Sequence, residues 1–387
     1  MRLIVLAIDG LHWGTLTELA ARGRLPTVAR LFAQGSAAAL SFPAPHHAAA
    51  HWACIATGLG AAQHGICHPL ASRADGLLLD PVRAPDPCRP PFWQQAWEAG
   101  LAARVVGWPA TLGSVLPPQA PPGSGVVADG FDHPETRAHA FWPLAPDAVV
   151  PRGDRALVHA ARVHPTQVNP AALDDLLTGL PMPPLRAPAQ QLMARWTSAH
   201  NLAVHWAEMG DWQLLALRLA GLPEWLAVAR MAGVTAPAAL QPWCRYLDLM
   251  LSRYLAVRGA DSRLLLLTAG AEDTGGLLLS GPDVASGRQH QCRAVDVAPT
   301  VRALLGLPPC VSAGRNLLAP ADASSAGPMP ADTAIAERLR APPDCDAIAL
   351  AWLAAQGIEA VDLSAMEGRA RGVRTASLDA WAEASPQ

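Results

Sequence analysis

The stretch RLIVLAIDG, residues 2–10, decides the fold. The residues before Asp9 are almost continuously apolar, and Ile4, Val5 and Ile8 are β-branched. A run of this kind without polar alternation is typical of a strand that is buried on both faces of a parallel sheet. Because Asp9-Gly10 is a turn signal that ends the run, the sequence predicts a central strand with Asp9 at its carboxyl end.

Strand and helix signals alternate along the chain. Helices are predicted at 13–22 and 26–34, through Trp52 to Ala56, and at 91–99, 190–208 and 238–257. Strands are predicted at 37–42, 103–107, 213–219, 264–268 and 276–280. This alternation predicts an α/β protein with a doubly wound, mostly parallel sheet and helices on both faces.

Changes in composition indicate the domain limits. We expect an α/β core at 1–318 with an inserted cap region at about 112–189, where Pro and Gly are frequent and periodicity is weak. Residues 319–331 (APADASSAGPMPA) have the composition of a linker. Residues 332–387 carry short helical patterns, which predict a helical C-terminal tail.

The overall composition argues against several classes of protein. Of the 387 residues, 51% are hydrophobic and 16% are charged, which favours a packed globular chain. The net charge is −3 and all 29 basic residues are Arg, without the basic run that nucleic-acid binding would require. We expect no membrane span, because no apolar stretch reaches about 18 residues. The seven scattered cysteines form no CxxC pair, which favours reduced thiols and a cytoplasmic protein.

Five stretches carry a family resemblance. They are IVLAIDG with GRLPTVARLFAQG at 4–35, HWACIATGLGAAQHGI at 51–66, PFWQQAWEAGLAARVVGWPAT at 91–111, RYLDLMLSRYLAVRGADSRLLLLT at 245–268 and VDVAPTVRALLGLP at 295–308. In order and spacing they resemble the type I phosphodiesterase/nucleotide pyrophosphatase branch of the alkaline phosphatase superfamily. That resemblance implies phosphoryl transfer at two metal ions, usually zinc, with a Thr or Ser nucleophile between them and Asp and His ligands at the carboxyl ends of the strands.

The resemblance also implies that most of the catalytic residues have been replaced. Asp9 matches the first metal ligand, but the nucleophile position, four residues before Trp52, is Ala48. The family's next Asp and His, four residues apart, fall on Pro223 and Ala227, and the Asp and His that follow the last central strand fall on Ala269 and Gly270. The final His has its counterpart in Thr274. Alanine, proline and glycine side chains bind no metal, so only one family ligand is expected to remain.

Several residues have alternative interpretations. Asp9 is either a residual metal ligand or a cap of the next helix. His47 and His51 have the i, i+4 spacing of metal ligands on a helix, and with His46 they lie beside the vacant nucleophile position. Asp273, with its neighbour Glu272, could replace a lost ligand or simply be a solvated loop carboxylate. For His64 and Asp296 we expect structural roles in a loop and in a helix cap.

Three hypotheses follow for function. The leading one is a catalytically inactive member of the family that acts by binding a small ligand or a protein partner, with no metal cofactor. The alternative is an active metal-dependent phosphodiesterase or phosphatase whose ligands have migrated to Asp9, His47, His51 and Asp273. The third is a structural scaffold without a ligand. Metal content after purification distinguishes the first two.

Overall fold

The computed structural model describes residues 2–42, 47–66, 70–72, 79–81, 89–135, 140–182, 184–259, 261–269, 274–284, 289–310 and 312–318. The chain divides into two compact units, one of residues 1–69 and 81–330 and the other of residues 70–80 and 331–387. Between residues 70 and 81, the short strands β3 (Leu70–Ser72) and β4 (Leu79–Pro81) pair with each other. The expected linker and C-terminal tail at 319–387 lie outside the described residues.

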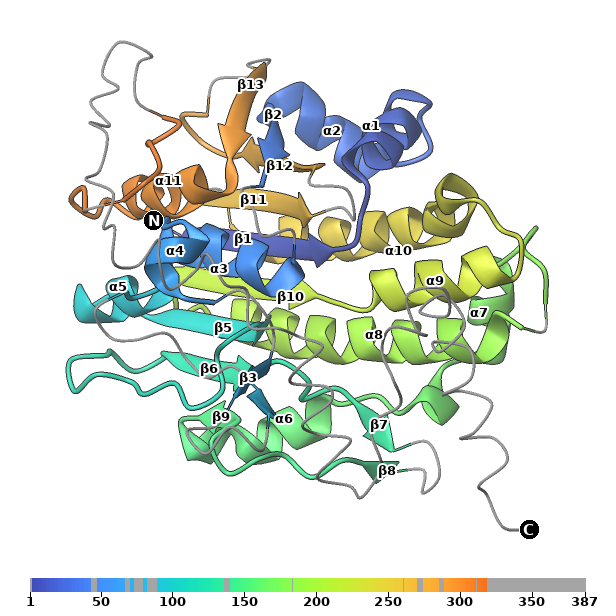
Figure 1. Ribbon diagram of the computed structural model, residues 1–387, viewed down its shortest axis with the longest axis horizontal. Coiled ribbons are helices and arrows are strands. Elements are labelled where there is room, and N and C mark those ends of the chain that lie inside the picture. Colours follow the sequence, from blue (N-terminus) through green and yellow to red (C-terminus); the bar gives the residue numbers. More distant parts are fainter. Residues whose placement is uncertain are drawn as a thin grey trace, which may run out of the picture. The chain divides into compact units, whose positions relative to one another are not determined.

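The first unit is built on a nine-stranded sheet in the order β13-β2-β12-β11-β1-β10-β5-β6-β9 (Figure 1). The five central strands are β11 (Ser262–Ala269), β1 (Arg2–Asp9), β10 (Leu214–Leu219), β5 (Ala103–Trp108) and β6 (Gly125–Ala128), and all of them run parallel. At the margins, β12 (Thr274–Ser280) runs antiparallel to both β11 and β2 (Ser36–Ser41), β13 (Gln289–Arg293) runs parallel to β2, and β9 (Val149–Val150) runs antiparallel to β6. The prediction of a mostly parallel α/β sheet is confirmed.

Alternate residues of β1 enter two separate cores, one on each face of the sheet. Ile4, Leu6 and Ile8 pack in one core and Leu3, Val5 and Ala7 in the other, as the alternation of side chains along a strand requires. The first core is covered by α1 (Trp13–Ala21), α2 (Pro26–Gln34), α6 (Arg155–Ala161), α7 (Pro170–Leu176), α8 (Arg186–Met209), α9 (Leu222–Met231) and α10 (Ala236–Val257). The second is covered by α3 (Ala48–Thr57), α5 (Phe92–Glu98) and α11 (Val297–Leu304), while the short helix α4 (Ala61–His64) follows α3.

The predicted helices and strands are present. The range 112–189 contains more regular secondary structure than its weak sequence periodicity indicated. Its strands β6 and β9 extend the main sheet beyond β5. After β6, the strands β7 (Pro134–Glu135) and β8 (Ala140–Phe141) form a separate antiparallel pair. The limits of an inserted cap region therefore stay a prediction.

A buried carboxylate fixes α2 to α10. Asp248 of α10 accepts the backbone N–H of Val28 at 2.8 Å and that of Thr27 at 3.2 Å. These are first-turn amides that have no partner within their own helix, and α2 has no side-chain cap at its N-cap residue, Leu25. Asp248 thus acts as the missing cap from a distant part of the chain.

None of the helices in the described ranges is both long and apolar enough to cross a bilayer.

Candidate functional site

Four of the positions implied by the family resemblance lie at one edge of the sheet. Asp9 ends β1 in register with Ala269 at the end of β11, and the Gly10 N–H donates to the Ala269 carbonyl at 2.7 Å. Pro223 packs on Gly10 so closely that a Cβ there would lie 2.7 Å from the proline Cδ. The Trp52 indole of α3 lies close enough to Asp9 to lower the pKa of that carboxyl, although its Nε1 makes no hydrogen bond among the described residues. Ala48 lies one helical turn before Trp52 on the same face of α3.

Asp9 is buried and faces the guanidinium of Arg218. Asp9 is only 8% exposed, and its Oδ2 lies 3.9 Å from Nη2 of Arg218. Burial raises the pKa of Asp9 above its ordinary value, because removal from water disfavours the charged form. Arg218 and the Trp52 indole oppose this rise in pKa, whereas the charges of Asp129 and Glu224 add to it.

Arg218 comes from β10, next to β1 in the sheet. It pairs in register with Ala7, so its side chain points to the same face of the sheet as Asp9 and Trp52. The residue is 7% exposed, and its Nη2 donates to Oδ2 of Asp129 at 3.1 Å. Its Nε and Nη1 are buried and have no hydrogen-bond partner among the described residues.

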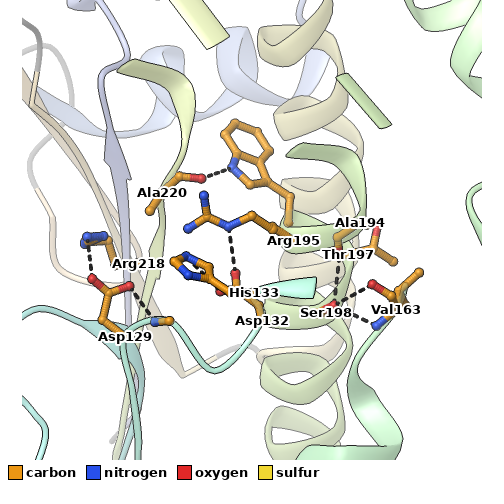
Figure 2. Close-up of polar contacts among 12 residues, drawn as sticks. Asp129, Asp132, His133, Val163, Ala194, Arg195, Thr197, Ser198, Arg218 and Ala220 are labelled. Carbon is orange, nitrogen blue, oxygen red and sulfur yellow. Dashed lines mark hydrogen bonds and ion pairs between the residues drawn. The ribbon is translucent and has the colours of Figure 1, made fainter. Parts of the chain in front are cut away.

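The loop that follows β6 is held by a second ion pair (Figure 2). Asp129 pairs with Arg218, and three residues later Oδ2 of Asp132 lies 3.5 Å from Nε of Arg195 on α8. The Arg195 guanidinium packs over Gly221, where a Cβ would lie 3.0 Å from its Nη1. Gly221 also has a φ of +105°, so the turn from β10 into α9 requires glycine for two reasons.

These arginines and carboxylates were not among the residues singled out from the sequence. One signal was available for Arg218, because it is the single charged residue in the otherwise apolar strand LLALRL. A charge at such a position is buried unless the strand lies at the edge of a sheet, and buried charges need partners. Its partner Asp129, and Asp132, which pairs with Arg195, come from the region without clear periodicity.

The histidines proposed as substitute ligands have local interactions. His47 is the N-cap of α3, and its Nδ1 accepts the Ala49 N–H at 3.2 Å. His51 is buried and stacks on Phe42, with ring centroids 4.3 Å apart. His46, Gly270, Glu272 and Asp273 lie outside the described residues.

The described side chains do not fit a two-metal centre. Within the ranges that the structure describes, no group of three or more His, Cys, Asp or Glu side chains is arranged to hold a metal ion. Asp9 is the single oxygen ligand among Asp9, Ala48, Pro223, Ala227 and Ala269, whereas a catalytic zinc ion needs three protein ligands.

His64 and Asp296 have structural surroundings. His64 lies 3.3 Å from the Cys54 sulfur and accepts the Ile66 N–H at Nδ1, and burial lowers its pKa to about 4. Asp296, at the start of α11, accepts the backbone N–H groups of Arg293 and Arg315, each at 2.9 Å. The side chains of both residues hold loops in place.

Comparison with known proteins places the chain in a family. No curated protein matches its sequence. A putative sulfatase from Bacteroides thetaiotaomicron is similar in structure, with a TM-score of 0.51 at 10% identity over 82% of this chain and 73% of that chain. Murine ectonucleotide pyrophosphatase/phosphodiesterase 5 has a TM-score of 0.49 at 11% identity, over 81% of this chain and 97% of that chain.

The family model for type I phosphodiesterase/nucleotide pyrophosphatase matches residues 3–222, which include β1, α3, β5 and β10. This match spans more than half of the sequence and contains Asp9 and Ala48. The chain therefore belongs to the type I phosphodiesterase/nucleotide pyrophosphatase family.

Proposed function

We propose that this family member does not hydrolyse phosphate esters and acts instead by binding a ligand. The observation that carries the proposal is the position of Arg218. Asp9, the one family ligand that remains in the described residues, faces the Arg218 guanidinium at 3.9 Å and lies beside an apolar surface of Pro223 and Ala269.

Electrostatics supports this proposal. A divalent ion on Asp9 would lie within several ångströms of a buried guanidinium that ion-pairs with Asp129. At about 4 Å and an effective dielectric constant of about 20, two unit positive charges repel by about 4 kcal/mol, and a divalent ion doubles this value. This repulsion opposes metal binding, and Asp9 supplies only one of the three protein ligands that a catalytic zinc ion needs. We therefore propose that Arg218 acts as the cation at this position.

The nucleophile position supports the same proposal. Ala48 has no oxygen that could attack phosphorus, and the activation of a hydroxyl at this site would in any case require a nearby metal ion or base. The scaffold that would present a nucleophile, the N-terminus of α3 beside the end of β1, is retained. We propose that the retained scaffold binds a ligand and that no metal cofactor takes part.

The test combines elemental analysis of the purified full-length protein with an assay for hydrolysis of bis-para-nitrophenyl phosphate, with and without added zinc or manganese. We expect far less than one equivalent of metal per chain and no turnover above the buffer blank. Two tightly held metal ions per chain would contradict the proposal. Turnover that is lost in Asp9→Asn would instead establish the enzyme with migrated ligands.

A further inference from the structure

We propose that α10, together with α2 and the turn before it, carries a docking surface for an acidic segment of a partner protein. We call it the arginine surface, and its residues are the exposed Arg24, Arg30, Arg245 and Leu249 and the half-buried Arg258. The partner segment is defined by its chemistry, since it must be rich in Asp or Glu. This binding is distinct from the ligand binding proposed at Asp9.

The positive charge of this surface is not balanced by neighbouring carboxylates. Elsewhere on α1 and α10, Arg22 pairs with Glu18 and Arg253 pairs with Glu208. None of the four arginines of the arginine surface has an ion pair in the part of the chain that the structure describes. Asp248, the one carboxylate of α10, is buried and accepts backbone N–H groups of α2 instead. Because the whole chain has a net charge of −3, this face is a local excess of positive charge.

The contact between α2 and α10 brings two of these arginines together. Asp248 accepts the Thr27 N–H at 3.2 Å, so the N-terminus of α2 lies against the middle of α10. Arg24 is three residues before Thr27 and therefore lies at this end of α2. Arg245 lies three residues before Asp248 on α10, which places it on the same side of that helix.

Arg30 and Arg258 lie toward the other end of the surface. Burial lowers the pKa of the Arg258 guanidinium, and the positive charge of Arg30 lowers it further. These two like charges repel each other, so a negative group from a partner would be favourable beside them. Arg258 stands four residues before Ser262, which begins β11 at the sheet edge opposite to Asp9. The arginine surface is therefore separate from the Asp9 site.

The chemistry of the surface favours a protein segment over a membrane or a nucleic acid. The exposed residues of α10 between Gln241 and Ala256 are Gln241, Arg245, Leu249, Ser252, Arg253 and Ala256. Leu249, which is 66% exposed, is the one large apolar side chain among them, whereas a helix that lies on a membrane needs a broad apolar face. The surface also has no aromatic residue on which the bases of a single strand could stack. Arginine is enriched in protein interfaces, and its planar fork binds carboxylates through two parallel hydrogen bonds.

The experiment measures the affinity of the full-length protein for a fluorescein-labelled oligoglutamate peptide by fluorescence anisotropy. A peptide of about 20 residues spans about 30 Å as a helix and is long enough to contact both ends of α2. We expect the wild-type protein to bind at low ionic strength and to lose affinity as sodium chloride is added, because salt screens exposed charges. Arg30→Glu and Arg245→Glu should each bind at least about tenfold more weakly, since each replaces an attraction by a repulsion.

The matched control is Arg152→Glu. Arg152 is exposed and belongs to the 3-10 helix η1 (Arg152–Asp154), which follows β9. β9 is the last strand at one end of the sheet, whereas α2 packs on β12 near the other end (Figure 1). This variant changes the net charge by the same amount as the other two, so we expect its affinity for the peptide to stay within about twofold of wild type.

Four outcomes would overturn the inference. They are a wild-type protein that does not bind the peptide at low salt, an unchanged affinity in Arg30→Glu or in Arg245→Glu, and an equal loss of affinity in Arg152→Glu. The fourth is binding of phosphatidylserine vesicles or of duplex DNA that is as tight as peptide binding and depends equally on Arg30 and Arg245, because the surface would then recognise another class of polyanion.

The proposed function is tested separately. Asp9→Asn should bind the peptide as wild type does, because Asp9 lies at the opposite edge of the sheet. Bound metal or hydrolytic activity would contradict the proposed function and leave the arginine surface unaffected. Loss of peptide binding in Arg30→Glu and Arg245→Glu, with metal content unchanged, would support the arginine surface alone.

Discussion

Replacement of Asp9 by asparagine tests whether a metal ion or Arg218 balances this carboxylate. Asparagine has the same shape but no charge, so the variant loses the attraction to Arg218. At the observed 3.9 Å this attraction is about 4 kcal/mol for an effective dielectric constant of about 20. The variant also avoids the burial of a carboxylate, which costs several kcal/mol. Burial is the largest influence on the pKa of Asp9 and raises it. At neutral pH we therefore expect the free energy of unfolding of Asp9→Asn to equal that of wild type or to exceed it by up to about 2 kcal/mol.

The pH dependence of this difference has a definite sign. Since the pKa of Asp9 is raised in the folded protein, the folded state holds the proton more tightly than the unfolded chain does. The stability that this proton confers is fully present below the unfolded pKa of about 3.9 and is lost as the pH rises through the folded pKa. Asparagine does not titrate. The stability of Asp9→Asn relative to wild type should therefore increase from acid to neutral pH.

The assay is urea unfolding between pH 4 and pH 8, in buffer with EDTA and again with added zinc. Asp175→Asn on α7 is the matched control, because Asp175 is exposed, and we expect a change within about 0.5 kcal/mol. Bound metal would predict the opposite result, since a ligand at 100 times its Kd stabilises the folded state by about 2.7 kcal/mol. If Asp9→Asn is less stable than wild type by more than about 1 kcal/mol, or loses a zinc-dependent stabilisation, the reasoning about Arg218 is refuted.

Variants at three further positions test the fold and the site. Asp248→Ala should lower the free energy of unfolding by about 3–5 kcal/mol in urea, because two buried N–H groups of α2 lose a charged acceptor. Asp248→Asn keeps one acceptor, so its loss in free energy of unfolding should be less than half of that of Asp248→Ala. Equal losses in the two variants would contradict the capping role. Ala48→Thr should give no phosphodiesterase activity with or without zinc, and measurable turnover would show that a hydroxyl alone was missing. His64 should lower stability on acidification, because its folded pKa of about 4 lies below the unfolded value, so stability present above about pH 6.5 is lost as the pH falls toward 4. His64→Gln should make the unfolding free energy less dependent on pH between 7 and 5, by about 2 kcal/mol, and an unchanged pH dependence would exclude this histidine as the cause.

Local patterns predicted most of the central sheet. The apolar run of β1 and the turn at Asp9-Gly10 placed a buried parallel strand, because such strands need apolar residues on both faces. The long helices α8 and α10 were also predicted within a few residues of their limits, since helical periodicity accumulates over several turns.

Short elements were missed for the same reason. β6 has four residues and β9 has two, and both lie in a range rich in Pro and Gly. A strand of this length contains too few residues for a periodic signal, and its existence depends on a partner strand. β6 forms against β5, and β9 forms against β6, so these strands depend on contacts that are distant in the sequence.

The sequence by itself determined which chemical groups are present at the family positions. A carboxylate at Asp9, a methyl group at Ala48 and a proline ring at Pro223 follow from the residue types alone. Only the tertiary structure decided what surrounds them. The parallel pairing of β1 with β10 sets Ala7 opposite Arg218 and so brings a guanidinium to Asp9. Strand order and register come from packing between distant segments, and no local pattern of hydrophobicity specifies which charged side chains will meet at the end of a sheet.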